Sequence, residues 1–190
     1  MSSPGLPLYT PSLSIRPFVV EDVEEIFRLS HEAAYRTWLS NQVYNDASEA
    51  RAAIEFLVAK YSDPGNPRLG PYVLAIEHQK DRALIGHVGF SPFGDDVEIG
   101  FAIGERYQGR GLATEAVAAA SQWALETFAL GRILGIASAV NIASKKTLIR
   151  ARFAHHKDCL MPFQGMEQNV AMYVLDLDRS SSQGRVGSTS

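Results

Sequence analysis

Residues 97–116 carry the residue types and spacings that point most directly to chemistry. An apolar, β-rich run over residues 97–103 leads into a loop with small residues at Gly109, Gly111 and Ala113, and a helical pattern follows at once. Glycines let successive backbone N–H groups point into one concavity, and the N-terminus of a helix carries about half a positive charge. These features predict a site for a phosphate or diphosphate that needs no basic side chain.

Two better-known phosphate loops do not fit this segment. A Walker loop ends in Gly-Lys-Ser/Thr, whereas this chain has Gly111-Leu-Ala-Thr114 with no lysine nearby. A dinucleotide-binding loop needs a third glycine where Thr114 stands and belongs to an opening βαβ unit, whereas this loop follows a run of strands at mid-chain. On the loop alone, a glycine-rich turn and a capped helix with no ligand stays open as the alternative.

Further motifs surround the loop Gln108-Gly-Arg-Gly111-Leu-Ala113: Glu98-Ile-Gly-Phe101 precedes it, and Ala113-Thr-Glu-Ala116 and Asn141-Ile-Ala-Ser144 follow it. With these motifs the chain resembles the GNAT superfamily of acetyl-CoA-dependent N-acetyltransferases, in the branch of the ribosomal-protein alanine N-acetyltransferases. The resemblance runs over about residues 13–174. It implies acetyl-CoA as the co-substrate and no metal.

The resemblance also implies how acetyl-CoA is held. The amides of residues 109–114 are expected to bind the diphosphate, and the strand edge at residues 101–103 to pair with the amide chain of the pantetheine arm. Family members splay two parallel strands here, and in this chain the gap would lie between residues 97–103 and 132–140. The residues implied in binding are Phe101, Ala102, Ile103, Gln108, Gly109, Arg110, Gly111, Leu112, Ala113, Thr114, Asn141 and Ser144.

Acetylation of an amine needs a group that removes the amine proton, a donor for the oxyanion and a proton for the leaving thiolate. Glu98 is the candidate base, because strand alternation puts it on one face with Gly100 and Ala102, and burial at a cleft would raise its pKa. A solvated strand carboxylate is the alternative interpretation of Glu98. A backbone N–H near Ile103 is the expected oxyanion donor.

Asn141 and Ser144 follow a strand and open a helix, so an N-cap pair is one interpretation of these two residues. The resemblance adds a contact from Asn141 to coenzyme A and makes Ser144 the candidate proton donor near the sulfur. Two positions depart from the family: Leu148 stands where many members have tyrosine, and Arg152 stands where they usually have glycine. We expect Arg152 to change the ending of the helix rather than to abolish activity.

Other conspicuous residues have ordinary structural interpretations. Cys159 lies outside the motifs and is expected to be a partly buried structural thiol rather than a nucleophile. His155 and His156 have no partner at metal-ligand spacing, which favours an exposed polar pair over a zinc site. Two interpretations, as lining of an acceptor pocket or as core, stay open for the aromatic residues near the first helices: Tyr35, Trp38 and Tyr44.

The composition is that of an ordinary folded protein, since 46% of the 190 residues are hydrophobic and 21% are charged. Eighteen basic and 21 acidic residues give a formal charge of −3, which offers no electrostatic surface for nucleic acid or an anionic membrane. One cysteine allows no internal disulfide, and neither a signal peptide nor an apolar run of about 18 residues is evident. We expect a cytoplasmic protein without nucleic-acid or membrane partners, as a monomer or homodimer.

The apolar pattern predicts a single domain over residues 8–178, with an irregular N-terminus at residues 1–7 and a flexible polar tail at residues 179–190. The fold class is mixed α/β, and the resemblance implies a GNAT-like central sheet of six or seven strands, largely antiparallel with one splayed parallel pair and flanked by helices. The expected strands cover residues 13–16, 72–77, 84–90, 97–103, 132–140, a stretch from 153 onward and 170–176, and the expected helices cover residues 23–30, 46–61, 112–128 and 144–151.

The function implied is transfer of acetyl from acetyl-CoA to a primary amine by direct attack in a ternary complex. A protein N-terminal α-amine, as in ribosomal proteins, is the implied acceptor. The alternatives are a small-molecule amine (a polyamine, an amino acid or an antibiotic) and a non-catalytic module that binds acyl-CoA.

Overall fold

Alternating apolar runs build one open sheet in the computed structural model, which describes residues 5–61 and 65–177. Within those residues the sheet has eight strands in the order β1-β2-β3-β4-β5-β6-β8-β7, and each neighbouring pair is antiparallel except β5 and β6. The strands are β1 (Leu8–Tyr9), β2 (Leu13–Arg16), β3 (Tyr72–His78), β4 (Ala83–Phe93), β5 (Asp96–Ile103), β6 (Arg132–Ser138), β7 (Ala154–Phe163) and β8 (Met166–Asp176).

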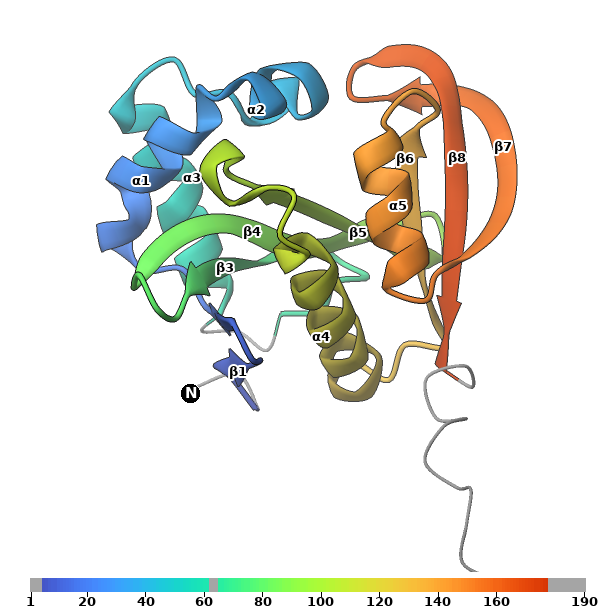
Figure 1. Ribbon diagram of the computed structural model, residues 1–190, viewed down its shortest axis with the longest axis horizontal. Helices are drawn as coiled ribbons and strands as arrows, with labels where there is room; N and C mark the ends of the chain where they lie inside the picture. The colour runs from blue at the N-terminus through green and yellow to red at the C-terminus, as the bar shows by residue number, and fades with distance from the viewer. Residues whose placement is uncertain (1–4, 62–64, 178–190) are drawn as a thin grey trace, which may run out of the picture.

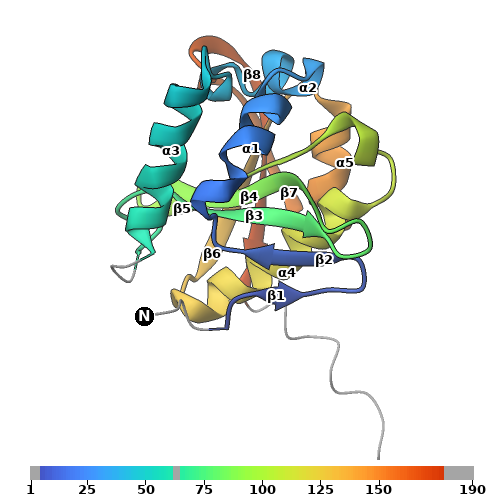
Figure 2. The ribbon, with the colours of Figure 1, turned by 90° about the vertical axis from the view of Figure 1, so that its left-hand side faces the viewer.

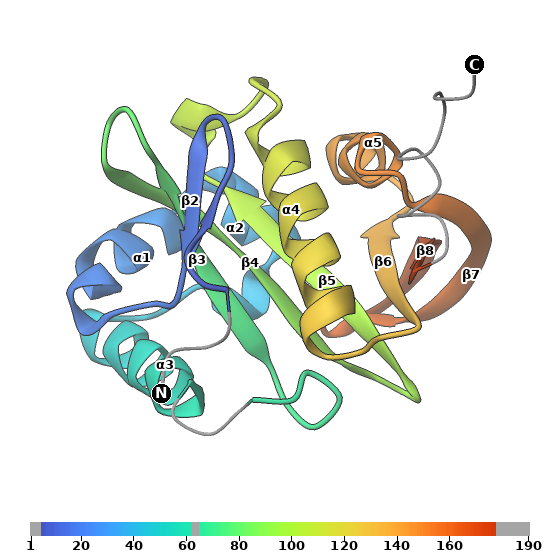
Figure 3. The same cartoon turned by 90° about the horizontal axis from the view of Figure 1, so that it is seen from below.

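Helices cover both faces of this sheet, as Figures 1 and 3 show. Helices α1 (Val23–Ser30) and α3 (Ala47–Lys60) pack on one face of the N-terminal half, in a separate apolar cluster. Helix α4 (Leu112–Thr127) packs on the other face, and α5 (Ile142–Arg150) contributes to the same core. The short α2 (Ala33–Trp38) lies beside the turn between β7 and β8, which Figures 1 and 2 show from two directions.

Strands β5 and β6 run parallel but diverge almost at once. Their register pairs only Glu98 with Leu134 and Ile99 with Gly135. Beyond these residues β5 stays paired with β4 to its end, and β6 stays paired with β8 to its end. Both strands therefore remain in the sheet although they no longer pair with each other. The splayed parallel pair that the resemblance implied is confirmed at the expected place.

The predicted strands and helices are present, with shifts at their ends, and two elements were not predicted. These are β1, which makes the sheet eight-stranded rather than six- or seven-stranded, and α2. The predicted flexible tail at residues 179–190 lies outside the described residues. Over the described part of the chain, no helix is long and apolar enough to cross a membrane.

Helix α5 ends in a Schellman motif. The Phe153 N–H donates to the Leu148 carbonyl and the Arg152 N–H donates to the Ile149 carbonyl, both at 3.0 Å. Arg152 adopts φ +71°, the left-handed conformation in which glycine is usual. The expected change in the helix ending is therefore wrong: arginine takes the conformation that a glycine would take, at a cost of about 1–2 kcal/mol.

Candidate active site

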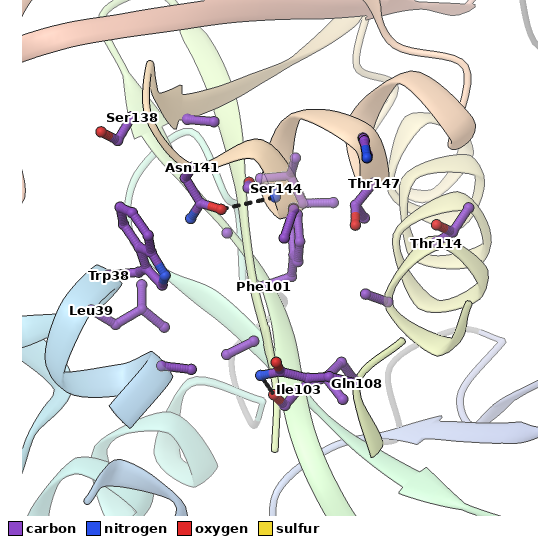
Figure 4. A pocket seen from close by; sticks show the side chains of 18 of the residues that line it. Trp38, Leu39, Phe101, Ile103, Gln108, Thr114, Ser138, Asn141, Ser144 and Thr147 are labelled. Carbon is purple, nitrogen blue, oxygen red and sulfur yellow. Dashed lines mark hydrogen bonds between the residues drawn. The ribbon is translucent and has the colours of Figure 1, made fainter. Parts of the chain in front are cut away.

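A cavity of about 420 Å³ lies where β5 and β6 diverge. Its walls come from both strands, the loop and first turn of α4 at residues 107–114, helices α2 and α5, and the turn between β7 and β8 (Figure 4). Each site residue implied by the sequence lines this cavity except Arg110. Segments far apart in the chain thus meet at the place where the main-chain pairing of the sheet is interrupted.

The loop before α4 leaves its backbone amides unpaired. Gly109 and Gly111 adopt φ +74° and +80°, which glycine does without strain. Helix α4 begins at Leu112, and the Glu115 N–H donates to the Gly111 carbonyl at 3.0 Å. Among the described residues, no acceptor pairs with the amides of residues 109–114, so they are available to an anion.

Side chains around the loop hold it in place. Gln108 donates from Nε2 to the Ile103 carbonyl at 2.8 Å. Tyr107 is buried, and its hydroxyl donates to Oδ2 of Asp81 at 2.9 Å. The Arg110 guanidinium lies 5.5 Å from the centroid of the Tyr107 ring, a cation–π contact that keeps its side chain off the cavity wall. Gln108 and Arg110 therefore use their side chains to brace the loop.

The edge of β5 that faces the gap carries main-chain groups outside the sheet pairing. The Gly104 N–H donates to the Ile85 carbonyl on β4 at 2.7 Å. Because successive residues of a strand turn their N–H and C=O groups to opposite edges, Phe101 and Ile103 turn theirs toward the gap. The Ile103 carbonyl is the one that accepts from Gln108. The remaining groups form the donor and acceptor pattern that an amide chain can match.

Glu98 lies at the point where β5 and β6 part, and its side chain lines the cavity. It is half-buried, and burial raises the pKa of its carboxyl above the ordinary value for glutamate. Within the described chain, its carboxylate has no hydrogen-bond or ion-pair partner. Gly100, the next residue on the same face, has open space where a Cβ would stand, which leaves room beside Glu98. The carboxylate is therefore not a freely solvated strand residue.

An oxyanion donor at Ile103 does not suit Glu98 as the base. The two residues are five apart, which is about 16 Å along an extended strand. A base has to lie within hydrogen-bond reach of the amine, directly or through one water. The Phe101 N–H faces the same gap and is only about 10 Å from Glu98 along the strand, within reach of a glutamate side chain and a water. The geometry thus favours Phe101 over Ile103.

Asn141 caps helix α5, since its Oδ1 accepts from the Ser144 N–H at 3.0 Å (Figure 4). The N-cap interpretation of this pair is confirmed, and both residues also line the cavity. Leu148 is fully buried against Gly135, where an added Cβ would come within 2.5 Å of it. The position at which many family members have tyrosine therefore faces the core in this chain. The hydroxyl-bearing residues of α5 on the cavity wall are Ser144 and Thr147.

The aromatic residues near the first helices divide between cavity and core. Trp38 lines the cavity, across from α5 (Figure 4). Tyr35 is buried, with its hydroxyl 3.2 Å from Nδ1 of His87, and burial lowers the pKa of His87 to about 4. Tyr44 packs against the core under α1 and α3, where burial raises its pKa. Only Trp38 of the three is therefore placed to meet a substrate.

Two other sequence candidates lie away from the cavity. Cys159 is partly buried, with its Sγ 3.7 Å from the Met172 sulfur, and lines no part of the cavity. His155 lies 3.0 Å from an Asp158 carboxylate oxygen on the exposed β7 strand. In residues 5–61 and 65–177, no cluster of three or more His, Cys, Asp and Glu side chains is arranged to hold a metal ion.

Sequence reasoning missed the contributions of the β7–β8 turn and of the basic side of α5. The turn adds Phe163 and Gln164 to the cavity wall, and α5 adds Lys146 and Arg150. Gln164 takes φ +53°, and its Oε1 is buried without a hydrogen-bond partner among the described residues. The available signal was the Gln-Gly dipeptide, because hairpin turns with positive φ at both central residues commonly have glycine second.

Comparison with known proteins agrees with this geometry. A family model described as an acetyltransferase (GNAT) domain matches residues 12–154. No curated protein sequence matches the chain. Among solved structures, ribosomal-protein-S5-alanine acetyltransferase from Vibrio fischeri is 15% identical, with a TM-score of 0.73 over 90% of this chain and 96% of that one.

Two further solved structures were determined with coenzyme A compounds. RimL, a ribosomal L7/L12 α-N-protein acetyltransferase in complex with coenzyme A, is 17% identical, with a TM-score of 0.74 over 90% of this chain and 98% of that one. The microcin C7 self-immunity acetyltransferase MccE, in complex with acetyl-CoA and AMP, is 17% identical, with a TM-score of 0.72 over 88% of this chain and 94% of that one. These structures share the fold, and the family model spans most of the described residues. The chain therefore belongs to the GNAT acetyltransferase family, which uses acetyl-CoA as the acetyl donor.

Proposed function

We propose that this protein is an N-acetyltransferase that transfers acetyl directly from acetyl-CoA to a protein N-terminal α-amine. The observation that carries the proposal is the meeting of three features around one cavity. They are the unpaired amides of residues 109–114, the open edge of β5 and the half-buried carboxylate of Glu98. The first two suit the diphosphate and the amide arm of acetyl-CoA, and the third suits an amine.

The donor is held chiefly by main-chain groups. The amides of residues 109–114 bind the diphosphate, helped by the N-terminal dipole of α4. Neither Gly109 nor Gly111 has a heavy atom within 4 Å of the place where a Cβ would stand, so the loop leaves room for the anion. The gap-facing edge at Phe101 and Ile103 pairs with the pantetheine amides. The thioester supplies the electrophilic carbonyl.

The reacting groups are then assigned by position. Glu98 takes the proton from the amine, directly or through a water, and its raised pKa brings it closer to the pKa of the amine. The Phe101 N–H donates to the oxyanion that forms as the amine nitrogen bonds to the thioester carbon. When the carbon–sulfur bond breaks, the Ser144 hydroxyl on α5 passes a proton to the leaving thiolate and takes one from solvent in its place, while Glu98 returns the amine proton to solvent. No covalent acyl-enzyme is needed, in keeping with the position of Cys159 away from the cavity.

The acceptor assignment has separate support. Of the three solved structures compared above, two are named as acetyltransferases of ribosomal proteins, one of them as an α-N-protein acetyltransferase. Trp38 at the end of α2, Leu39 directly after it and Phe163 at the end of β7 add apolar side chains to the cavity wall, and Glu98 is the one carboxylate among the described residues that line it. Such a wall suits one amine carried on an uncharged chain.

A panel of acceptors tests the proposal. Release of coenzyme A thiol is measured with peptides beginning Ala, Ser and Met, with the same peptides N-acetylated, and with spermidine and free lysine. We expect release with the free peptides, and one acetyl group added at the α-amine by mass spectrometry. Release with spermidine or lysine but with no peptide refutes the acceptor. Tight coenzyme binding without release for any amine favours a non-catalytic module.

A further inference from the structure

Helix α2 takes the cap of its first turn from another segment of the chain. Its N-cap residue is Glu32, whose side chain makes no cap hydrogen bond. Both oxygens of that carboxylate have other partners: Oε1 accepts from Arg28 at 3.0 Å, and Oε2 accepts from the Glu105 N–H at 2.7 Å. The Ala34 N–H, in the first turn of α2, donates instead to Oε1 of Glu105 at 3.3 Å. Glu32 and Glu105, which are 73 residues apart, therefore join the start of α2 to the loop after β5 by two hydrogen bonds.

This cap from outside the helix matters because α2 is short. The helix has six residues, and helices of that length are not stable on their own in water. A cap that satisfies a free N–H group at the start of a helix stabilises the helical state. Tyr35 anchors the middle of α2, since its buried hydroxyl lies 3.2 Å from Nδ1 of His87. One anchor would leave a short helix free to pivot about that point, and the hydrogen bond to Glu105 supplies a second point.

The cap fixes the part of α2 that lies on the cavity. Ala34 and Trp38 are four residues apart, so their side chains share one side of the helix, and both residues line the cavity. Glu105 does not line the cavity, but it belongs to the same loop as the free amides of residues 109–114. One loop therefore offers its amides to acetyl-CoA and also holds the first turn of the helix that carries Trp38.

We propose that Glu105 is a positioning residue for the acceptor: its carboxylate holds the first turn of α2 and so keeps Trp38 on the wall that meets the amine. This inference rests on the proposed function, which supplies the acceptor. The Glu105 side chain is exposed and lies outside the cavity lining, so its replacement disturbs neither the core nor a substrate contact. The hydrogen bond from its N–H to Glu32 belongs to the main chain and remains in an alanine or glutamine variant.

The test compares wild type with Glu105→Ala and Glu105→Gln, using a short peptide that begins with Ser. Alanine removes the acceptor of the Ala34 N–H, whereas glutamine keeps an amide oxygen in its place. We expect Glu105→Ala to raise KM for the peptide about two- to tenfold, with kcat at saturating peptide and the dissociation constant of acetyl-CoA unchanged. Glu105→Gln should restore KM to near the wild-type value. Glu24→Ala, at an exposed glutamate of α1, is the matched control and should behave as wild type.

Hydrogen exchange of the α2 amides provides a readout that does not depend on activity. Residues 33–38 should exchange faster in Glu105→Ala than in wild type and in Glu105→Gln, while the exchange of α4 stays the same. An unchanged peptide KM in Glu105→Ala, an equal rise of KM in Glu105→Gln, or unchanged exchange of α2 overturns this inference while the proposed function stands. A wild type that acetylates simple amines but no peptide overturns the proposed function. The KM comparison, repeated with the amine that is acetylated, then still decides whether Glu105 positions the acceptor.

Discussion

Replacement of Glu98 by glutamine tests the assignment of the general base while keeping the size of the side chain. The carboxylate is half-buried on the cavity wall, and among the described residues it has no partner that an amide would lose. A positioned general base contributes about 10²- to 10⁴-fold to the rate. We expect Glu98→Gln to lower kcat/KM for a peptide acceptor by that factor. The dissociation constant of acetyl-CoA should stay unchanged, because Glu98 is not among the residues expected to bind it.

The pH dependence of the rate separates Glu98 from the substrate. In wild type, kcat/KM falls tenfold per pH unit below about 7.7–8.0, where the peptide α-amine takes up a proton. It falls a hundredfold per unit below the pKa of Glu98, which burial places above the ordinary glutamate value of 4.5. Glu98→Gln should keep the first slope and lose the second. A variant whose profile still steepens at low pH would show that another group is the base.

Stability provides a second measurement on the same variant. Because the pKa of Glu98 is higher in the folded than in the unfolded protein, the unfolded state gives up its proton first as pH rises. The favourable contribution of protonated Glu98 is therefore present below the unfolded pKa and is lost as pH rises through the folded value. Urea denaturation should find Glu98→Gln more stable than wild type at pH 7, with a smaller difference at pH 4. An equal difference at both pH values would contradict the assigned burial.

Three further substitutions test other parts of the structure. Gly100→Val places a side chain in the open space beside Glu98, and we expect kcat/KM for peptides to fall at least about tenfold while calorimetry gives an unchanged acetyl-CoA affinity. Tyr107→Phe removes the hydrogen bond to Asp81 that braces the loop, so acetyl-CoA should bind about two- to tenfold more weakly by calorimetry, with kcat kept. Ala129→Gly relieves φ +48° after α4 and should raise the free energy of unfolding in urea by about 1 kcal/mol; a loss of stability would contradict the assigned strain.

Some parts of the site could be predicted because local residue chemistry determines them. Glycines at 109 and 111 before a periodic helix allow a row of free amides, and Asn141 ahead of a helix favours the cap that the structure has. Helix α2 escaped prediction because it is shorter than two turns and Glu32, its N-cap, makes no side-chain cap hydrogen bond. Its contribution of Trp38 to the cavity depends on packing beside a hairpin distant in sequence.

Other features of the site depend on side-chain directions and interatomic distances, which the spacing of residues in the sequence does not give. Arg110 belongs to the loop motif, but its guanidinium stacks on the ring of Tyr107, three residues earlier in the chain, rather than entering the cavity. The apolar run over residues 97–103 correctly placed Glu98 and Ile103 in one strand. The geometry of that strand separates them by about 16 Å, too far for both to act on one reaction centre. The residues of β5 and β6 contain no pattern that predicts where the pairing of the two strands stops. Only the family resemblance therefore predicted their divergence.

The polar groups around the cavity are unpaired for a different local reason in each case. The amides of residues 109–114 are free because the glycines on either side of Arg110 turn the chain into a helix N-terminus. The edge of β5 is free beyond Ile99 because its register with β6 ends at Gly135, the glycine on which Leu148 of α5 packs. The Gln164 oxygen is buried in a turn whose two central residues take positive φ, and none of the described residues donates a hydrogen bond to it. To pair any of these groups within the chain, the strands or the turn would have to close on the cavity, and each such change would remove the space for a substrate. Unpaired main-chain and amide groups, more than charged side chains, therefore define this site.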